Sequence, residues 1–103
     1  MTWTVSLTKE AKDDLARLER FLEQAAVQSG DFELPLRAVD AILSEFAILE
    51  RNPYTCRKTG HDPRERELVI PFGKSGYVAL FHIVGAGEIV VSAVRHQRED
   101  DYH

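Results

Sequence analysis

The hydrophobic period of the chain changes at Asn52-Pro53, and this change limits the folds that the sequence can adopt. From residue 9 to residue 51, apolar side chains recur every three or four positions, as they do along one face of an α-helix. Beyond Pro53 apolar and polar side chains alternate, which is typical of strands. Helices followed by a run of strands favour an α+β layer over an alternating α/β fold.

Two helices are predicted before the change of period. The first spans about residues 9–28 and follows Thr8, a residue suited to capping a helix. The second begins near Pro35, which suits a first turn, and ends near Arg51, because the residue before a proline avoids the α region. A short polar linker separates them, so we expect a helical hairpin.

Four strands are predicted around this hairpin. A short strand at residues 3–7 precedes the first helix, and three strands follow the second as an antiparallel meander, at 66–70, 77–84 and 88–95. Residues 52–64 are expected to form a loop, 71–76 a turn and 85–87 a hairpin loop. The fold class is therefore α+β, a single domain of residues 1–103 with the helix hairpin packed on one face of a mainly antiparallel sheet.

Length and composition exclude several classes of protein. No apolar run in the 103 residues approaches the roughly 18 residues that span a bilayer, and the start has no signal-peptide pattern. The single cysteine, Cys56, cannot form an internal disulfide and lacks the spacing of a zinc site. We therefore expect a cytoplasmic protein without a metal or a cofactor.

The net charge of −4 is unevenly distributed. Residues 1–50 carry five Lys/Arg and ten Asp/Glu, residues 51–98 carry eight and four, and the tail 99–101 adds three acids. Overall acidity argues against nonspecific binding of polyanions, which requires cationic faces. The basic second half still allows a local anion site.

The last predicted strand ends in Arg95-His96-Gln97-Arg98, which places two guanidinium groups and an imidazole at a strand exit. Such a group suits an anion or a nucleic acid, and His96 could act as an acid or a base. The alternative is structural: the arginines could pair with residues 99–101 on the surface, and His96 could be a hydrogen-bonded strand end. We expect His82, which lies between apolar residues, to be structural.

Several short motifs occur in order along nearly the whole chain. They are the early strand followed by Thr8-x-x-Ala11-x-x-Asp14-Leu15, Asn52-Pro53 at the end of the second helix, Arg66-Glu67-Leu68-Val69, Ser75-Gly76-Tyr77, and Val94-Arg95-His96-Gln97-Arg98-Glu99. With this element order and length, the chain resembles the RelE/ParE superfamily of type II toxin–antitoxin toxins, and its ParE-like branch in particular.

The resemblance implies a bacterial growth-inhibiting toxin that a small antitoxin, encoded beside it, holds inactive. It also implies one of two activities. RelE-like members cut mRNA on the ribosome, whereas ParE-like members poison DNA gyrase and block replication. Because the fold is the same for both activities, the choice between gyrase and the ribosome has to be argued from the residues of the site.

RelE-like toxins carry an arginine directly after the Gly-Tyr of the central strand, where this chain has Val78. Valine can neither clamp nor protonate a phosphate, and a pI near 5.5 suits a protein target better than a ribosome. We therefore favour gyrase. Two alternatives are ribosome-dependent mRNA cleavage, with Arg66, Arg95, His96, Arg98 and Tyr102 as catalytic candidates, and a non-toxic interaction module.

The candidates for binding the target or the antitoxin are Arg66, Tyr77, Arg95, His96, Arg98 and Tyr102. The central strand is apolar on both faces, with Val78 and Leu80 on one and Ala79 and Phe81 on the other. Strands of this kind are usually covered on both faces. We expect the helix hairpin on one face and the antitoxin on the other face or along a free strand edge, as a helix or an added strand.

Overall fold

The structure, a computed structural model, describes residues 2–98 of the chain. In chain order its elements are β1 (Thr4–Leu7), α1 (Lys9–Ser29), α2 (Leu34–Arg51), the 3-10 helix η1 (Pro53–Thr55), β2 (Arg57–Lys58), β3 (Glu65–Phe72), β4 (Ser75–Gly85) and β5 (Glu88–His96). Tyr102 and the acidic stretch 99–101, which the sequence analysis named, lie outside the described residues.

Both predicted helices are confirmed, and local chemistry explains their ends. Thr8 caps α1, because its Oγ1 accepts a hydrogen bond from the backbone N–H of Ala11 at 3.1 Å. Gly30 ends α1 in the left-handed region, with φ at 81°. Pro35 lies in the first turn of α2, and Asn52, extended before Pro53, ends it.

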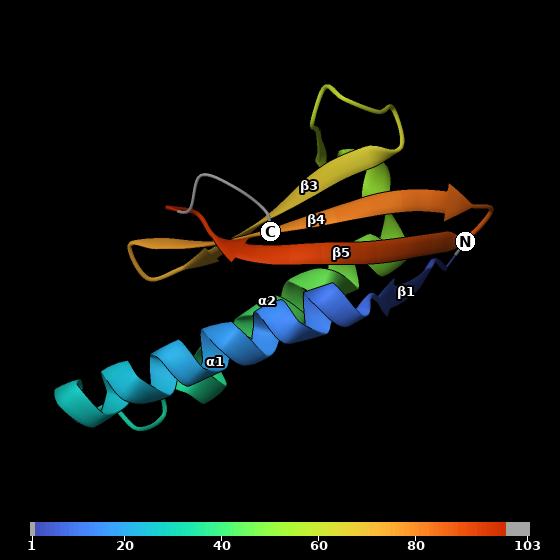
Figure 1. Cartoon of the computed structure of the whole chain (residues 1–103). Helices are drawn as coiled ribbons and strands as arrows, with labels where there is room; N and C mark the ends of the chain where they lie inside the picture. Colours follow the sequence, from blue (N-terminus) through green and yellow to red (C-terminus); the bar gives the residue numbers. More distant parts are fainter. Residues whose placement is uncertain (1, 99–103) are drawn as a thin grey trace.

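The strands form one five-stranded sheet in the order β1-β5-β4-β3-β2. The predicted meander is confirmed: β3, β4 and β5 pair antiparallel, while β1 lies parallel to β5. A register shift pairs Leu80 with Ala93 but Phe81 with Val91, so β5 carries a bulge at Ser92. Both helices lie on the same face of the sheet, as predicted (Figure 1).

The boundaries within the meander differ from the prediction. The expected turn at residues 71–76 is shorter, because β3 continues to Phe72 and β4 already begins at Ser75. Gly76 permits this tight pairing, since a Cβ at its position would lie 2.1 Å from the carbonyl oxygen of Ile70. The expected loop at 52–64 contains η1 and the two-residue strand β2, which pairs with Arg66 and Glu67. Elements this short carry no period that a sequence pattern could reveal.

The hydrophobic core lies between the helix hairpin and the sheet. Its members from α1 and α2 include Leu18, Ile42, Phe46 and Leu49, and its members from the sheet include Leu68, Ile70, Tyr77, Ala79, Phe81, Ile89, Val91 and Val94. Leu68 and Ile70 are buried, while Val69 between them is 39% exposed on the opposite face, as the alternation of β3 predicted.

The opposite face of the sheet is more polar than the sequence of β4 alone suggested. Val78 and Ala93 are buried there, but Glu67 lies beside them and pairs with Arg57 at 3.1 Å and with Arg95 at 3.9 Å. Near the start of β3, Glu65 contacts His82 across the strands at 2.9 Å, which gives His82 a structural hydrogen bond. The face therefore combines apolar contacts with ion pairs.

One end of the helix hairpin projects past the sheet (Figure 1). Large apolar side chains are exposed on the two helices and on the linker between them: Phe21, Val27, Phe32, Leu36 and Leu43.

Within residues 2–98, no helix has the length and apolarity needed to cross a membrane.

Candidate functional site

The described site residues from the sequence analysis lie in three separate places. Arg66 lies beneath η1, Arg95 lies on the face opposite the helices, and Tyr77, His96 and Arg98 line one pocket. The structure therefore brings together three of the five described candidates.

Arg66 is a largely buried side chain that joins β3 to the segment around η1. Its Nη1 donates hydrogen bonds to the carbonyl oxygens of Tyr54 at 3.2 Å and Cys56 at 2.8 Å. Its guanidinium also lies 5.3 Å from the centre of the Tyr54 ring, a cation–π contact. With only 9% of the residue exposed, these contacts hold the guanidinium inside the protein.

Arg95 points away from the helices, beside Glu67. Its Nη1 donates to the carbonyl oxygen of His96 at 3.2 Å and to that of Gln97 at 3.4 Å, which folds the side chain over its own strand end. Arg95 and His96 are neighbours in sequence, so their side chains leave β5 on opposite faces of the sheet. The Arg-His pair of the sequence therefore does not form one cluster.

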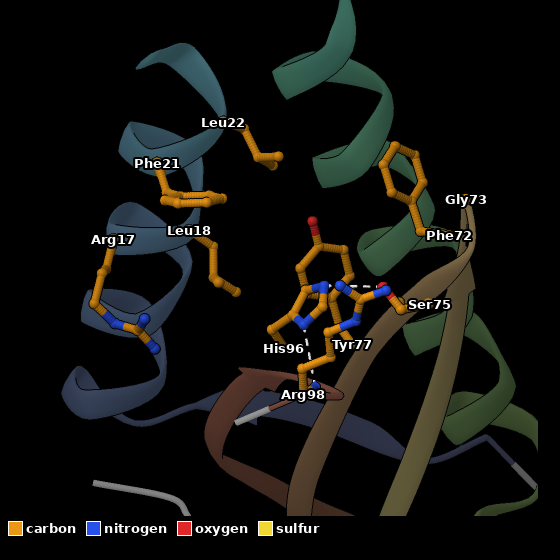
Figure 2. A pocket seen from close by; sticks show the side chains of 11 residues that line it. Arg17, Leu18, Phe21, Leu22, Phe72, Gly73, Ser75, Tyr77, His96 and Arg98 are labelled. Atoms are coloured by element: carbon orange, nitrogen blue, oxygen red, sulfur yellow. Dashed lines mark hydrogen bonds between the residues drawn. The ribbon is translucent and has the colours of Figure 1, made fainter. Parts of the chain in front are cut away.

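The pocket lies between α1, the β3–β4 turn and the end of β5, and it has a volume of about 690 Å³ (Figure 2). It is lined by Arg17, Leu18, Phe21, Leu22, Phe72, Gly73, Ser75, Gly76, Tyr77, His96 and Arg98. The α1 residues project from successive turns of one helix face, whereas Gly73 and Gly76 contribute no side chain to the pocket wall. We call this space the α1–β5 pocket.

Tyr77 forms the inner wall of the α1–β5 pocket. The residue is only 3% exposed, its ring contacts those of Phe72 and His96, and its hydroxyl points into the pocket (Figure 2). Burial raises the pKa of the Tyr77 phenol above its usual value near 10, so the hydroxyl stays protonated at neutral pH and can donate a hydrogen bond.

Two hydrogen bonds fix the tautomer of the neutral His96 ring. The backbone N–H of Arg98 donates to Nδ1 at 3.1 Å, and a backbone N–H can only donate. Nδ1 is therefore unprotonated, and Nε2 carries the hydrogen that it donates to Ser75 Oγ at 3.0 Å. The imidazole thus ties the end of β5 to the β3–β4 turn.

The polar groups that line the α1–β5 pocket are mainly cations and hydrogen-bond donors. Arg98 contributes a guanidinium group, as does Arg17, whose Nη2 lies 4.0 Å from Asp14 Oδ1, and Ser75 and Tyr77 contribute hydroxyls. Among the described residues that line the pocket, none is Asp or Glu. The pocket therefore suits an anionic or hydrogen-bond-accepting group.

Sequence reasoning missed Arg17, Phe21, Leu22, Phe72 and Ser75 as site residues. Phe21 carried a signal in the sequence, because it lies beside the apolar stripe of α1, and the structure shows that its side chain is mostly exposed. Cys56 is half-buried, and desolvation raises the pKa of its thiol, which leaves it unreactive at neutral pH. Within residues 2–98, no group of three or more His, Cys, Asp or Glu side chains is placed to hold a metal ion.

A family model and a solved structure match nearly the whole chain. Over residues 5–101 the chain matches the family model described as ParE toxin of type II toxin–antitoxin system, parDE. Among solved structures it is similar to a chain of a chromosomal ParDE TA system from P. aeruginosa, with a TM-score of 0.70 and 21% sequence identity, covering 92% of this chain and 96% of that chain. At 21% identity, the similarity to this solved structure shows a shared fold and nothing more. No curated protein matches the chain.

Proposed function

Because the chain belongs to the ParE toxin family of type II toxin–antitoxin systems, we propose that it poisons DNA gyrase and so blocks replication. We propose further that a cognate antitoxin neutralises it by covering the exposed part of the helix hairpin, in place of the opposite sheet face or free strand edge expected from the sequence. The observation that carries the choice of gyrase over mRNA is that Arg66 and Arg95 lie apart from the pocket that holds His96 and Arg98, so the described catalytic candidates do not surround one phosphate.

Cleavage of RNA without a metal requires several groups around one phosphate. A base must take the proton of the 2′-hydroxyl, an acid must protonate the leaving oxygen, and cations must stabilise the phosphorane. Arg66 is held by backbone carbonyl groups beneath η1, and Arg95 lies on the other face of the sheet. Neither guanidinium can reach a phosphate bound in the α1–β5 pocket.

Val78 and His96 support the same choice. Val78 follows Gly76-Tyr77 and is buried on the face away from the helices, where it can offer no charge. Both ring nitrogens of His96 already make hydrogen bonds within the protein, so its use as a base would require the Arg98 N–H to leave Nδ1. Binding to a protein target requires no charge at position 78 and no proton transfer by His96.

The antitoxin surface is supported by the exposed apolar side chains of the helix hairpin. Phe21, Val27, Phe32 and Leu36 are each 65% exposed or more, although side chains of this size are usually at least partly buried. Apolar patches of this kind commonly mark an interface with another protein. An amphipathic antitoxin helix lying along the hairpin would remove them from water.

The first test follows DNA synthesis and protein synthesis separately, by pulse labelling, after the chain is induced in a bacterial host without its antitoxin. We expect DNA synthesis to fail first, with filamentation and a DNA-damage response, while protein synthesis continues. A collapse of protein synthesis within minutes would instead support ribosome-dependent cleavage and overturn the proposed target.

Single substitutions at the α1–β5 pocket separate the two mechanisms further. For a nuclease, His96→Gln or Arg98→Gln should reduce activity by orders of magnitude if the residue is catalytic. For a poison that acts by binding, we expect each to weaken growth inhibition in smaller steps, because binding energy is spread over several residues. Arg64→Gln, an exposed arginine near the start of β3, is the matched control and should leave toxicity unchanged.

A further inference from the structure

The α1–β5 pocket has an apolar part and a polar part, and this division restricts its ligands. Leu18, Phe21, Leu22 and Phe72 form the apolar wall, Ser75 and Arg98 lie near the end of β5, and the Tyr77 hydroxyl points from there toward the apolar wall (Figure 2). A volume of about 690 Å³ falls within the range of roughly 300–1,000 Å³ that small-molecule sites occupy. The space therefore suits a compact ligand with an apolar body and one polar head.

The Tyr77 hydroxyl is a donor without a protein acceptor. In the part of the chain that the structure describes, no hydrogen bond is made by this hydroxyl. The residue is only 3% exposed, but its oxygen is open to the pocket and is not one of the fully buried atoms without a partner. The hydroxyl is therefore available to donate a hydrogen bond to a ligand that enters the pocket. In Figure 2 it points into the pocket between Leu22 and Phe72.

Ser75 offers a second donor near the first. Its oxygen accepts the hydrogen bond from His96 Nε2, so the hydrogen of the Ser75 hydroxyl remains available for another acceptor. Arg98 adds a positive charge, and its guanidinium makes no ion pair with any residue between 2 and 98. Two neutral donors and one cation that line the same pocket match the two oxygens and single charge of a carboxylate.

We propose that the α1–β5 pocket binds a small carboxylate with an aromatic or branched apolar body. The carboxylate lies against Tyr77, Ser75 and Arg98, and the apolar body packs against the side chains from α1 and Phe72. A nucleotide is a poorer match, because its sugar and several phosphates would face leucine and phenylalanine side chains. This binding goes beyond the proposed action on gyrase and does not depend on it.

The test measures binding of 3-phenylpropionate to the purified chain by NMR titration of backbone amides. We expect saturable shifts at Gly73, Gly76 and Arg98, with a dissociation constant between about 10 µM and 1 mM, ordinary for a ligand this small. The uncharged 3-phenylpropanamide, which has nearly the same shape, should bind at least about tenfold more weakly. Inorganic phosphate, which has no apolar body, should cause no saturable shift at these residues.

Two variants assign the contacts. Tyr77→Phe should weaken binding of the carboxylate about three- to tenfold, the effect of one lost hydrogen bond, and Arg98→Gln should weaken it about tenfold or more. Arg98 is exposed, so Arg98→Gln keeps the test valid even if Tyr77→Phe unfolds the protein. Arg64→Gln is the charge-matched control and should bind as the parent chain does.

Three results would overturn the proposal. They are the absence of saturable shifts up to 10 mM ligand (roughly tenfold above the weakest expected constant), equal affinity for the carboxylate and the amide, and shifts confined to residues outside the pocket. Because the titration contains neither gyrase nor antitoxin, a failure here would leave the proposed target untouched. Conversely, a failure of the pulse-labelling test would leave the ligand proposal standing.

Discussion

At the scale of single residues, Asp14 shows how a charged side chain becomes part of the core. Its Oδ2 accepts the backbone N–H of Val94 at 2.9 Å, a contact between residues 80 positions apart. The parallel pairing of β1 with β5 stops at Val91, so this amide lies beyond the ladder. The Asp14 carboxylate therefore replaces a missing strand partner and fixes α1 against β5.

We predict that Asp14→Ala lowers the free energy of unfolding by about 1–3 kcal/mol, because it leaves the Val94 amide buried without an acceptor. Asp14→Asn retains a carbonyl oxygen and should cost less. Urea denaturation of both variants measures the effect, and Asp13→Ala, at the exposed neighbouring position, should stay within about 0.5 kcal/mol of the parent. Equal losses at positions 13 and 14 would show that the Val94 contact contributes nothing.

Gly76 is the second residue at which local geometry decides the fold. It has φ at 138°, and an added Cβ would lie 2.1 Å from the Ile70 carbonyl oxygen. We predict that Gly76→Ala destabilises the protein by more than about 3 kcal/mol, since steric overlap adds to backbone strain of about 1–3 kcal/mol. Gly73→Ala is the control, because its φ is 60° but nothing lies within 4 Å of an added Cβ. Thermal unfolding should place the two variants well apart.

At the scale of elements, Arg66 links β3 to η1 and β2. We predict that Arg66→Met, which removes the hydrogen bonds to Tyr54 and Cys56, lowers stability by about 1–3 kcal/mol and speeds hydrogen exchange of amides in residues 54–58. Amides in α1 should exchange as before at low denaturant. A loss of toxicity at unchanged stability and exchange would instead show that Arg66 contacts the target.

The helix hairpin is the element whose surface we assign to the antitoxin. Phe32→Ser and Leu36→Ser change exposed side chains, so each should leave stability within about 0.5 kcal/mol of the parent. We predict that the double variant binds the protein encoded beside this chain at least about tenfold more weakly, measured by calorimetry. Asp40→Ser on the exposed side of α2 is the matched control. Unchanged affinity in the double variant would place the antitoxin elsewhere.

At the scale of the whole molecule, the sequence predicted the architecture well because strong periods specify it. The two helices and the three-stranded meander follow from apolar spacing, the Thr8 cap and Pro53, all of which act locally. The parallel pairing of β1 with β5 joins chain segments more than 80 residues apart, and no local pattern encodes it. The two-residue strand β2 was missed for the opposite reason, because it is too short to show a period.

The site was harder to predict because it depends on directions that sequence order hides. Arg95 and His96 are adjacent in the chain, yet the alternation of β5 sends them to opposite faces of the sheet. Arg66 resembled a cation for binding, but the carbonyl groups that hold it come from a loop folded back over β3. The pocket walls from α1 became visible only once the helix and the β3–β4 turn were placed together.

The most direct test of the central claim is a supercoiling assay with the purified chain, DNA gyrase and relaxed plasmid. We predict that the chain inhibits supercoiling in a dose-dependent way, that cleaved plasmid accumulates, and that prior addition of the antitoxin restores activity. Full supercoiling at a large molar excess of the chain, together with cleavage of mRNA on translating ribosomes, would contradict the assignment of gyrase as the target.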